Sequence, residues 1–192
     1  AVKTIVEQVD AMKRLVNEFR DYARLPAADL NALDLNALVV DVLHLYGNDV
    51  GDDESRIQTQ LDPACPLVRG DAQQLRQVIH NLLQNAQDAS DIAHLEGREN
   101  QVLIRTQWVE STRRVRLSVQ DHGAGFPEHI LKRAFEPYVT TKVRGTGLGL
   151  AVVKKIADEH GARVDISNRV SEGVVRGAQV SLSFAIANTQ TA

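Results

Sequence analysis

The chain has 192 residues, of which 43% are hydrophobic and 24% are charged, and its formal net charge is -3. This length suits one ordinary domain with an appended element, and the composition excludes a disordered or fibrous chain. The slight excess of acidic residues argues against a protein that binds nucleic acid, because such proteins neutralise phosphates with an excess of Lys and Arg.

The single cysteine, Cys65, cannot form an internal disulfide, which suits a reducing compartment. No apolar stretch approaches the ~20 residues that span a bilayer, and no signal peptide opens the chain. The sequence begins Ala-Val-Lys, without Met, inside a helical pattern. We therefore expect a soluble piece of a longer protein.

The first predicted element is a helix with a seven-residue period of apolar residues. One series contains Val2, Val9, Val16 and Ala23, and the other contains Ile5, Met12 and Phe19. Such a seam is typical of a helix that packs on another helix in a coiled coil or bundle. An amphipathic helix docked on its own domain is the alternative. Pro26 ends the helix, and the Ala-rich stretch after it predicts a linker over residues 27–32.

The rest of the sequence predicts alternating helices and strands. The first are a helix over Asn36–Tyr46 closed by Gly47, an acidic turn over Gly51–Ser55, a strand over Arg56–Leu61, and a helix from the N-cap Asp71 to about Ala89. A hairpin of Gln101–Val109 and Arg113–Gln120 follows, and then a short helix from Pro127 to about Phe135. The last are a helix over Leu148–His160 stopped by Gly161, and strands over Arg163–Asn168 and Ala178–Ile186. The helix from Asp71 should bury its apolar residues, which are Leu75, Val78, Ile79, Leu82, Leu83 and Ala86. The predicted architecture is a two-layer α+β fold, in which helices cover one face of a mixed sheet.

Three polar residues share one face of the helix from Asp71. Asn81 and Asn85 are four positions apart, and Asp88 follows one turn later. An Asn amide oxygen can bind Mg²⁺, which takes the rest of its shell from water and nucleotide phosphates. The alternative is a pair of solvent-facing asparagines.

A carboxylate followed by glycines ends the second strand of the predicted hairpin. In the segment Asp121–Gly125 the glycines let a planar ring approach the backbone, while the carboxylate can accept a hydrogen bond from an exocyclic amine. The same five residues are also compatible with an ordinary turn.

A glycine-rich loop, Gly145–Leu150, leads into the helix that ends at His160. Its backbone N–H groups and the helix start suit phosphate binding, but the spacing fits neither a dinucleotide fingerprint nor a P-loop. Just before it, Phe135–Tyr138 can anchor a loop, and Lys142 and Arg144 can reach phosphates. A solvent-exposed loop with unpaired cations is the alternative.

In this order, the four segments closely resemble the catalytic ATP-binding domain of sensor histidine kinases, whose superfamily includes DNA gyrase B, mismatch-repair ATPases and heat-shock chaperone ATPases. The N box resembles Asn81–Ala89, the G1 box Asp121–Gly125, the F box Phe135–Tyr138 and the G2 box Gly145–Leu150. The first helix resembles the second helix of the kinase dimerization hairpin, and its sequence is most similar to that of nitrogen-regulation sensor kinases.

The resemblance implies a Bergerat-type ATP-binding fold over residues 33–187, after a partial hairpin at 1–26 and the linker at 27–32, with a tail at 188–192. It implies ATP and Mg²⁺ as ligands, with Asn85 on the metal and Asp121 on adenine. The expected nucleotide-site residues are Asn85, Asp88, Asp121, Gly123, Gly125, Phe135, Thr141, Lys142, Gly145, Thr146, Gly147, Leu148 and Gly149. Catalysis would use Asn81, Asn85 and Lys142. The segment Gly177–Gln179 departs from the family's last box, so we expect no nucleotide contact from it.

The resemblance also implies partners. These are a phosphoacceptor histidine helix of the same kinase and a cognate response regulator, within a homodimeric full-length protein. The domain would be cytoplasmic, and its parent would be anchored in the inner membrane. The phosphoacceptor histidine of the family is followed by Glu or Asp, which is true of none of His44, His80, His94, His122, His129 and His160. We therefore expect ATP binding without self-phosphorylation.

Two other functions compete with the kinase interpretation. A gyrase-type ATPase would need a Glu at position 81 as general base, where this chain has Asn81. A degenerate scaffold or an anti-sigma-type regulator belongs to a different class, but regulators of that type normally lack the heptad helix. His80, beside the N box, either orients the transferred group or lies on the helix surface.

Overall fold

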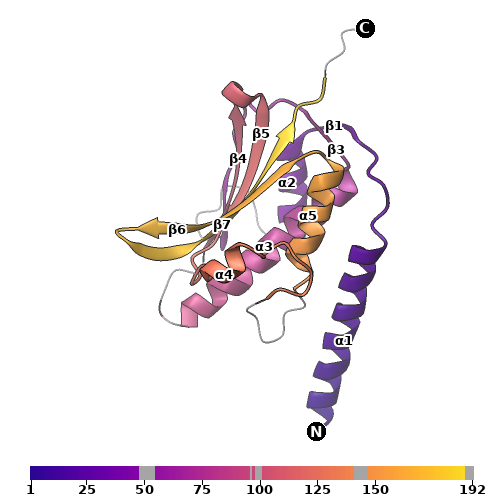
Figure 1. Ribbon diagram of the computed structural model, residues 1–192, viewed down its shortest axis with the longest axis vertical. Coiled ribbons are helices and arrows are strands. Elements are labelled where there is room, and N and C mark those ends of the chain that lie inside the picture. Colours follow the sequence, from indigo (N-terminus) through magenta and orange to yellow (C-terminus); the bar gives the residue numbers. More distant parts are fainter. Residues whose placement is uncertain (48–54, 96, 98–100, 141–146, 189–192) are drawn as a thin grey trace.

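The computed structural model describes residues 1–47, 55–95, 97, 101–140 and 147–188 (Figure 1). Its elements are α1 (Val2–Ala23), β1 (Asn31–Leu33), α2 (Leu35–Leu45), β2 (Ile57–Gln60), β3 (Val68–Gly70), α3 (Ala72–Leu95), β4 (Val102–Val109), a 3-10 turn (Glu110–Thr112), β5 (Arg114–Gln120), α4 (Glu128–Leu131), α5 (Gly149–Glu159), β6 (Arg163–Ser171) and β7 (Val174–Ala185). The predicted α+β class is confirmed.

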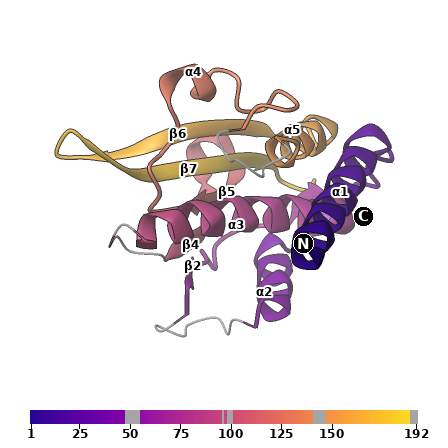
Figure 2. The ribbon, with the colours of Figure 1, turned by 90° about the horizontal axis from the view of Figure 1, so that it is seen from below.

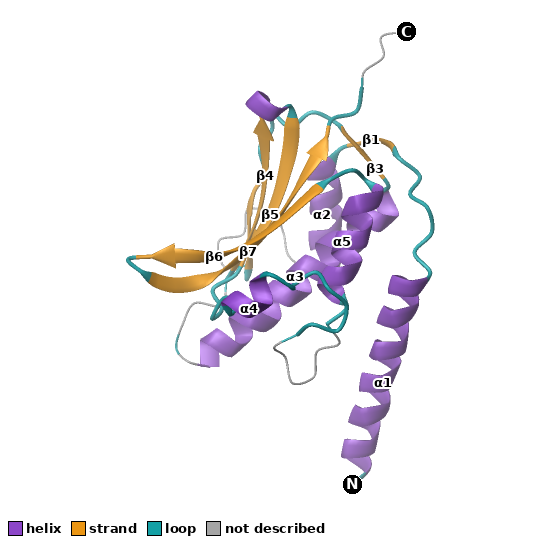
Figure 3. Ribbon diagram, in the orientation of Figure 1, coloured by secondary structure: helices purple, strands orange, loops and turns teal. Residues whose placement is uncertain are grey.

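One five-stranded mixed sheet organises the domain. Its strand order is β2-β4-β5-β7-β6, in which β2 is parallel to β4 and the other pairs are antiparallel. The helices α2, α3 and α5 lie together on one face of this sheet (Figure 3). Seen from below, α3 lies between α2 and α5 and contacts both (Figure 2). The predicted two-layer arrangement is therefore present.

The core fills the space between the sheet and the three helices. All six apolar residues predicted on the inner face of α3 are buried, and so are Ile104, Leu117 and Phe184 from the sheet. Burial of apolar surface at these positions stabilises the fold by roughly 25 cal/mol per Å².

Three predicted boundaries are wrong. The helix from Asp71 extends beyond Ala89 to Leu95, because Ser90 and Ala93 continue its buried face. The helix after Pro127 ends at Leu131, where the chain changes to tight turns with hydrogen bonds between residues three apart. The last two strands are longer than predicted and form one hairpin, whose turn residues Glu172 and Gly173 both have positive φ. Of the turn predicted over Gly51–Ser55, residues 51–54 lie outside the described residues.

Two short strands escape sequence analysis. β1 pairs antiparallel with β3, which joins the segment after the linker to the segment before α3. Strands of three residues are too short to display a period-two pattern. Asp34 and Asp71 then cap the following helices by accepting hydrogen bonds from the backbone of Ala37 and Gln74, respectively.

The apolar seam of α1 is exposed. The large apolar residues of the two seven-residue series, which begin at Val2 and at Ile5, are between 44% and 75% exposed. No residue of α1 is buried. Docking of this seam on its own domain is therefore wrong. In the described chain, no helix is long and apolar enough to cross a membrane.

The end of α1 and the following linker contact the domain. The Lys155 ammonium on α5 donates a hydrogen bond of 2.6 Å to the Tyr22 carbonyl oxygen and lies 4.9 Å from the centroid of the Tyr22 ring. The side-chain amide of the buried Gln74 donates to the Pro26 carbonyl oxygen at 2.8 Å. Both contacts come from helices that also border the site described below.

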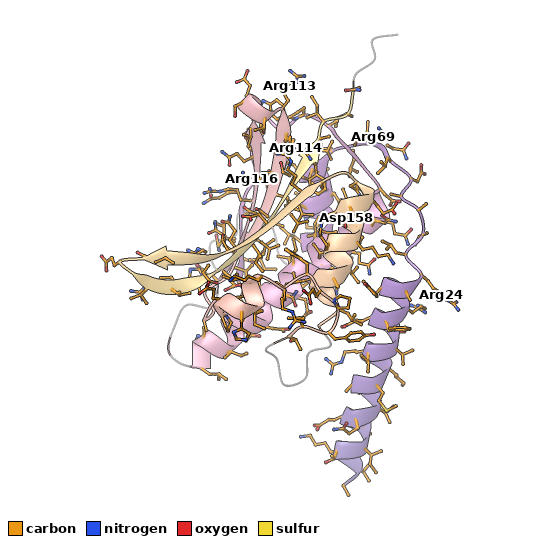
Figure 4. The ribbon with its side chains drawn as sticks, in the orientation of Figure 1. Arg24, Arg69, Arg113, Arg114, Arg116 and Asp158 are labelled. Carbon is orange, nitrogen blue, oxygen red and sulfur yellow. The ribbon has the colours of Figure 1, made fainter. Side chains whose placement is uncertain are left out.

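The Lys155→Met variant should loosen the end of α1, because it removes a hydrogen bond and a cation-π contact, together about 1 kcal/mol. Trypsin should then cleave roughly 5-fold faster after Arg24, which is exposed at the end of α1 (Figure 4). The matched variant Lys154→Met also removes one lysine, but Lys154 binds Asp158 within α5. Equal acceleration in both variants would show that the Lys155 contact does not hold α1.

Candidate functional site

Two asparagine side chains of α3 form one wall of the candidate site. Asn81 and Asn85 are half-buried, and the Asn81 amide donates a hydrogen bond of 3.3 Å to the Gly149 carbonyl oxygen. A Cβ atom added to Gly149 would lie 3.5 Å from the Asn85 amide nitrogen. Both asparagines therefore lie against the start of α5, and the alternative of solvent-facing residues is wrong for Asn81.

Asp121, which follows β5, is only 9% exposed. Its Oδ1 accepts hydrogen bonds from the backbone N–H groups of Gly123 at 2.8 Å and Ala178 at 3.0 Å. Burial raises the pKa of this carboxyl, and the two hydrogen bonds oppose that shift. Among the described residues no donor binds Oδ2, so this oxygen is the acceptor that Asp121 can offer to a ligand amine.

The strands β6 and β7 hold the backbone of Asp121 in place. Gly177 has a φ of 142°, and a Cβ atom there would lie 1.9 Å from the Asp121 carbonyl oxygen. Arg169 donates a hydrogen bond of 2.7 Å to that same oxygen. The segment Gly177–Gln179, for which the sequence predicts no nucleotide contact, thus positions Asp121. Sequence patterns miss Arg169 and Ala178 because they lie 48 and 57 positions from Asp121.

The glycines after Asp121 allow close approach of two neighbouring elements. A Cβ atom on Gly123 would lie 2.9 Å from the Cβ of Ala89 on α3. A Cβ atom on Gly125, whose φ is 74°, would lie 2.7 Å from Asn168 Oδ1. Asn168 also binds both backbone groups of Phe126, each at 2.8 Å. Asn168 is another positioning residue that the sequence does not single out, since the contact spans 42 positions.

The aromatic segment and the glycine loop meet at one point. Tyr138 donates its backbone N–H to the Gly147 carbonyl oxygen at 3.0 Å, and both residues have positive φ. A Cβ atom on Gly147 would lie 2.5 Å from the Tyr138 carbonyl carbon. Phe135 is half-buried and Tyr138 is 60% exposed. The predicted anchoring of the loop is therefore made by the backbone of Tyr138.

The start of α5 carries the last described part of the glycine loop. Leu148 is fully buried, and α5 begins without a side-chain cap at this residue. The backbone N–H groups at the start of a helix suit an anion. Four further residues predicted at the site, which are Thr141, Lys142, Gly145 and Thr146, lie outside the described residues.

Asp88 and His80 lie on α3 near the two asparagines. The carboxylate of Asp88 accepts a hydrogen bond of 3.0 Å from Gln84, one turn earlier on the same helix. The exposed His80 ring shares a 2.7 Å hydrogen bond with the hydroxyl of Tyr46, the residue that follows α2. This contact favours the surface role of His80 over a role in orienting a reacting group.

The described part of the site offers a divalent cation few protein ligands. Among the described residues, no group of three His, Cys, Asp or Glu side chains could hold a metal ion. Mg²⁺ keeps several waters and commonly takes only one or two protein ligands beside substrate phosphates. The Asn85 amide, next to the start of α5, fits that limited role.

The geometry brings the predicted segments together around α3. Asn81 and Asn85 lie against Gly149, and Ala89 lies against Gly123. From Asn81 to Ala89 is eight residues of helix, or about 12 Å. A ligand lying along α3 would therefore meet an amine acceptor at one end and helix N–H donors at the other.

Comparison with known proteins gives a family match. The model of the histidine kinase-, DNA gyrase B-, and HSP90-like ATPase family matches residues 70–188. The chain is 36% identical over 178 residues to an NtrY-like sensor histidine kinase of Rickettsia bellii, covering 91% of this chain and 27% of that protein. It is 34% identical over 181 residues to the nitrogen regulation protein NtrY of Azorhizobium caulinodans, covering 94% and 23%. The chain thus spans about a quarter of the length of these relatives.

Solved structures agree in fold. Full-length ShkA in complex with AMPPNP superposes with a TM-score of 0.73 at 28% identity, covering 98% of this chain and 39% of that one. The histidine kinase ThkA, in complex with the response regulator TrrA, superposes with a TM-score of 0.74 over 99% of this chain and 52% of that one. At 24% identity, the ThkA match supports the fold alone.

Proposed function

This chain belongs to the histidine kinase-, DNA gyrase B-, and HSP90-like ATPase family, and from that premise we propose that it binds ATP and transfers the γ-phosphoryl group to a histidine on a dimerization helix. The named relatives are sensor histidine kinases, which makes a protein-histidine kinase the activity that fits best. The observation that carries the proposal is the buried carboxylate of Asp121, whose Oδ1 is fixed by two backbone N–H groups while Oδ2 faces no described donor.

The ATP molecule would lie along α3. Its adenine amine would donate to Asp121 Oδ2, and the close packing of Gly123 on Ala89 would hold this carboxylate beside α3. Its phosphates would lie at the start of α5, near Gly149, where the backbone N–H groups of a helix N-terminus attract negative charge. Thr141, Lys142, Gly145 and Thr146 would complete the phosphate site, and Asp88 would contact the nucleotide from α3.

Mg²⁺ would neutralise part of the phosphate charge, with Asn85 as its protein ligand. Asn81 lies one turn away and has no proton-accepting carboxylate, so it cannot act as the general base that activates water. The chain should therefore hydrolyse ATP slowly. In the transfer reaction, the bond between the γ-phosphorus and the bridging oxygen breaks, a bond from phosphorus to an imidazole nitrogen forms, and ADP leaves.

The proposal extends to the parent protein. Residues 1–26 would form the second helix of a dimerization hairpin, whose exposed seam would pack on other helices in a homodimer. Residues 27–32 would be the linker, residues 33–187 the catalytic domain, and residues 188–192 a tail. The domain would be cytoplasmic, the parent would be anchored in the inner membrane, and the phosphoryl group would pass to an aspartate of a cognate response regulator.

Nucleotide binding should weaken as the pH falls. Asp121 must be ionised to accept the hydrogen bond from adenine. Because burial raises the pKa of this carboxyl, its protonation and the loss of binding should occur at a pH above the ordinary Asp pKa of about 3.9. The sign for stability is opposite, because a raised folded-state pKa stabilises the fold as Asp121 becomes protonated. Calorimetric titrations between about pH 4.5 and 7 should therefore show that the affinity for the nucleotide falls toward the lower pH while the chain stays folded. The weaker nucleotide binding of the Asp121→Asn variant should not depend on pH in this way. Equal pH dependence of binding in the variant and the unchanged chain would contradict the role of Asp121 as the adenine acceptor.

Phosphoryl transfer can be tested with radioactive ATP. The chain alone should become labelled on none of its histidines, whereas a separate peptide containing a hairpin helix with a His-Glu pair should acquire acid-labile label. Slow release of free phosphate should accompany this transfer. Rapid hydrolysis without labelling of any histidine helix would support a gyrase-type ATPase, and absence of nucleotide binding by the folded chain would support the scaffold function.

A further inference from the structure

The main sheet buries one face and leaves the other polar. On β5 and β7, the core residues Val115, Leu117, Leu182 and Phe184 point toward the helices. Successive side chains of a strand point to opposite faces, so the residues between them lie on the face away from α3 and α5. That polar face is therefore separate from the candidate nucleotide site.

The strand register places one serine between two arginines on this face. Arg116 on β5 is the partner of Ser183 on β7, and Ser183 is in turn the partner of Arg163 on β6. Adjacent strands are ~4.8 Å apart, which puts the Cα atoms of the two arginines roughly 10 Å apart. Both arginines are exposed, and Arg116 is labelled on β5 in Figure 4.

A third guanidinium group is fixed beside the same serine. Arg114 Nε donates to Ser183 Oγ at 3.1 Å, and Arg114 Nη2 donates to the carbonyl oxygens of Ser183 at 2.6 Å and Gly161 at 3.0 Å. Burial lowers the pKa of Arg114, and the positive charge of Arg163 lowers it further. Like charges held this close together are stabilised by an anion.

Two of these charges have no salt-bridge partner in the part of the chain that the structure describes. Among the described residues, the side chains of Arg116 and Arg163 form no hydrogen bond or salt bridge, and the exposed Asp165 forms none either. The hollow between them encloses about 260 Å³, and its charged lining consists of the three arginines and Asp165. Sites for drug-sized ligands enclose ~300–1,000 Å³, so this hollow suits a single small group.

We propose that this hollow binds a phosphate dianion, either free or as a phosphomonoester. Guanidinium groups bind phosphate oxygens through paired N–H donors, and the hydroxyl groups of Ser181 and Ser183 supply further donors. The lining has two more positive charges than negative ones, which matches a dianion, whereas a single carboxylate would neutralise only one of them. The site does not depend on nucleotide binding at α3.

The test is an NMR titration of the isotopically labelled chain with inorganic phosphate, with ionic strength kept constant with sodium chloride. The backbone amides of Ser181 and Ser183 should shift in a saturable manner. The Arg116→Gln and Arg163→Gln variants should each raise the dissociation constant about 10-fold, because each removes a charge-assisted contact. The matched control is Arg105→Gln on β4, which lies on the same face but binds Gln60. This control should change the dissociation constant less than about 2-fold.

Several outcomes would overturn the site. Equal weakening by Arg105→Gln would indicate a general effect of net charge, and equal shifts with chloride alone would indicate non-specific screening. Shifts caused by a Glu-rich peptide but not by phosphate would make the face a protein-docking surface instead. A parallel titration with O-phosphoserine separates the two sources, because a monoester site would bind it at least as tightly as inorganic phosphate and a free-phosphate site would bind it more weakly.

Discussion

Replacing Gly177 by alanine should lower the free energy of unfolding by about 4 kcal/mol. The new Cβ would lie 1.9 Å from the Asp121 carbonyl oxygen and 2.8 Å from its carbonyl carbon. These are backbone atoms paired with β7, so they cannot move without breaking the link between Asp121 and Ala178. Urea unfolding followed by the fluorescence of the single tryptophan, Trp108 on β4, measures this change.

Gly173→Ala is the matched control in the same hairpin. Gly173 also has a positive φ, 75°, but a Cβ atom there would meet nothing within 4 Å. Its replacement should cost only about 1 kcal/mol of backbone strain. If the two variants lost equal stability, the close approach of β7 to Asp121 would not be what requires glycine at position 177.

Replacing Asp121 by asparagine should weaken binding of a non-hydrolysable ATP analogue about 100-fold, or about 2.7 kcal/mol. The amide oxygen can still accept from the backbone N–H groups of Gly123 and Ala178, so the fold should be kept. The amide nitrogen, however, would present a donor to the adenine amine where the carboxylate presents an acceptor. Calorimetric titration measures the loss.

Two further measurements make this result specific. The Asp165→Asn variant removes one exposed carboxylate from the opposite face of the sheet and should bind the analogue as the unchanged chain does. Urea unfolding should show that the Asp121→Asn variant is as stable as the unchanged chain or more stable, because a buried charge is removed. Unchanged affinity in a folded Asp121→Asn variant would exclude Asp121 as the adenine acceptor.

Local sequence patterns predict much of the fold. The apolar spacing along α3 identifies its buried face, because helical periodicity depends only on neighbouring turns. The hairpin of β4 and β5 follows from two β-rich runs joined by three polar residues, and its antiparallel pairing is confirmed. The seven-residue period of α1 predicts a helix that packs on another helix and not on its own domain, and its apolar seam is exposed in this structure.

What the sequence misses are contacts between distant positions. The links from Arg169 and Ala178 to Asp121, and from Asn168 to Phe126, join residues 42 to 57 positions apart. Periodicity shows which face of an element is buried but gives no information about its partner. The segment Gly177–Gln179 is an example. Its sequence departs from the family's last box, and nothing in that sequence shows that position 177 requires glycine because the Asp121 backbone lies so close.

The most direct test of the central claim is an NMR titration of the unchanged chain with a non-hydrolysable ATP analogue, with and without Mg²⁺. Saturable shifts should appear together at the backbone amides of Gly123, Ala178 and Gly149, and Mg²⁺ should alter the Asn85 side-chain amide. This pattern would place one nucleotide along α3 between Asp121 and the start of α5. A folded chain that shows no saturable shifts at these amides would contradict the account.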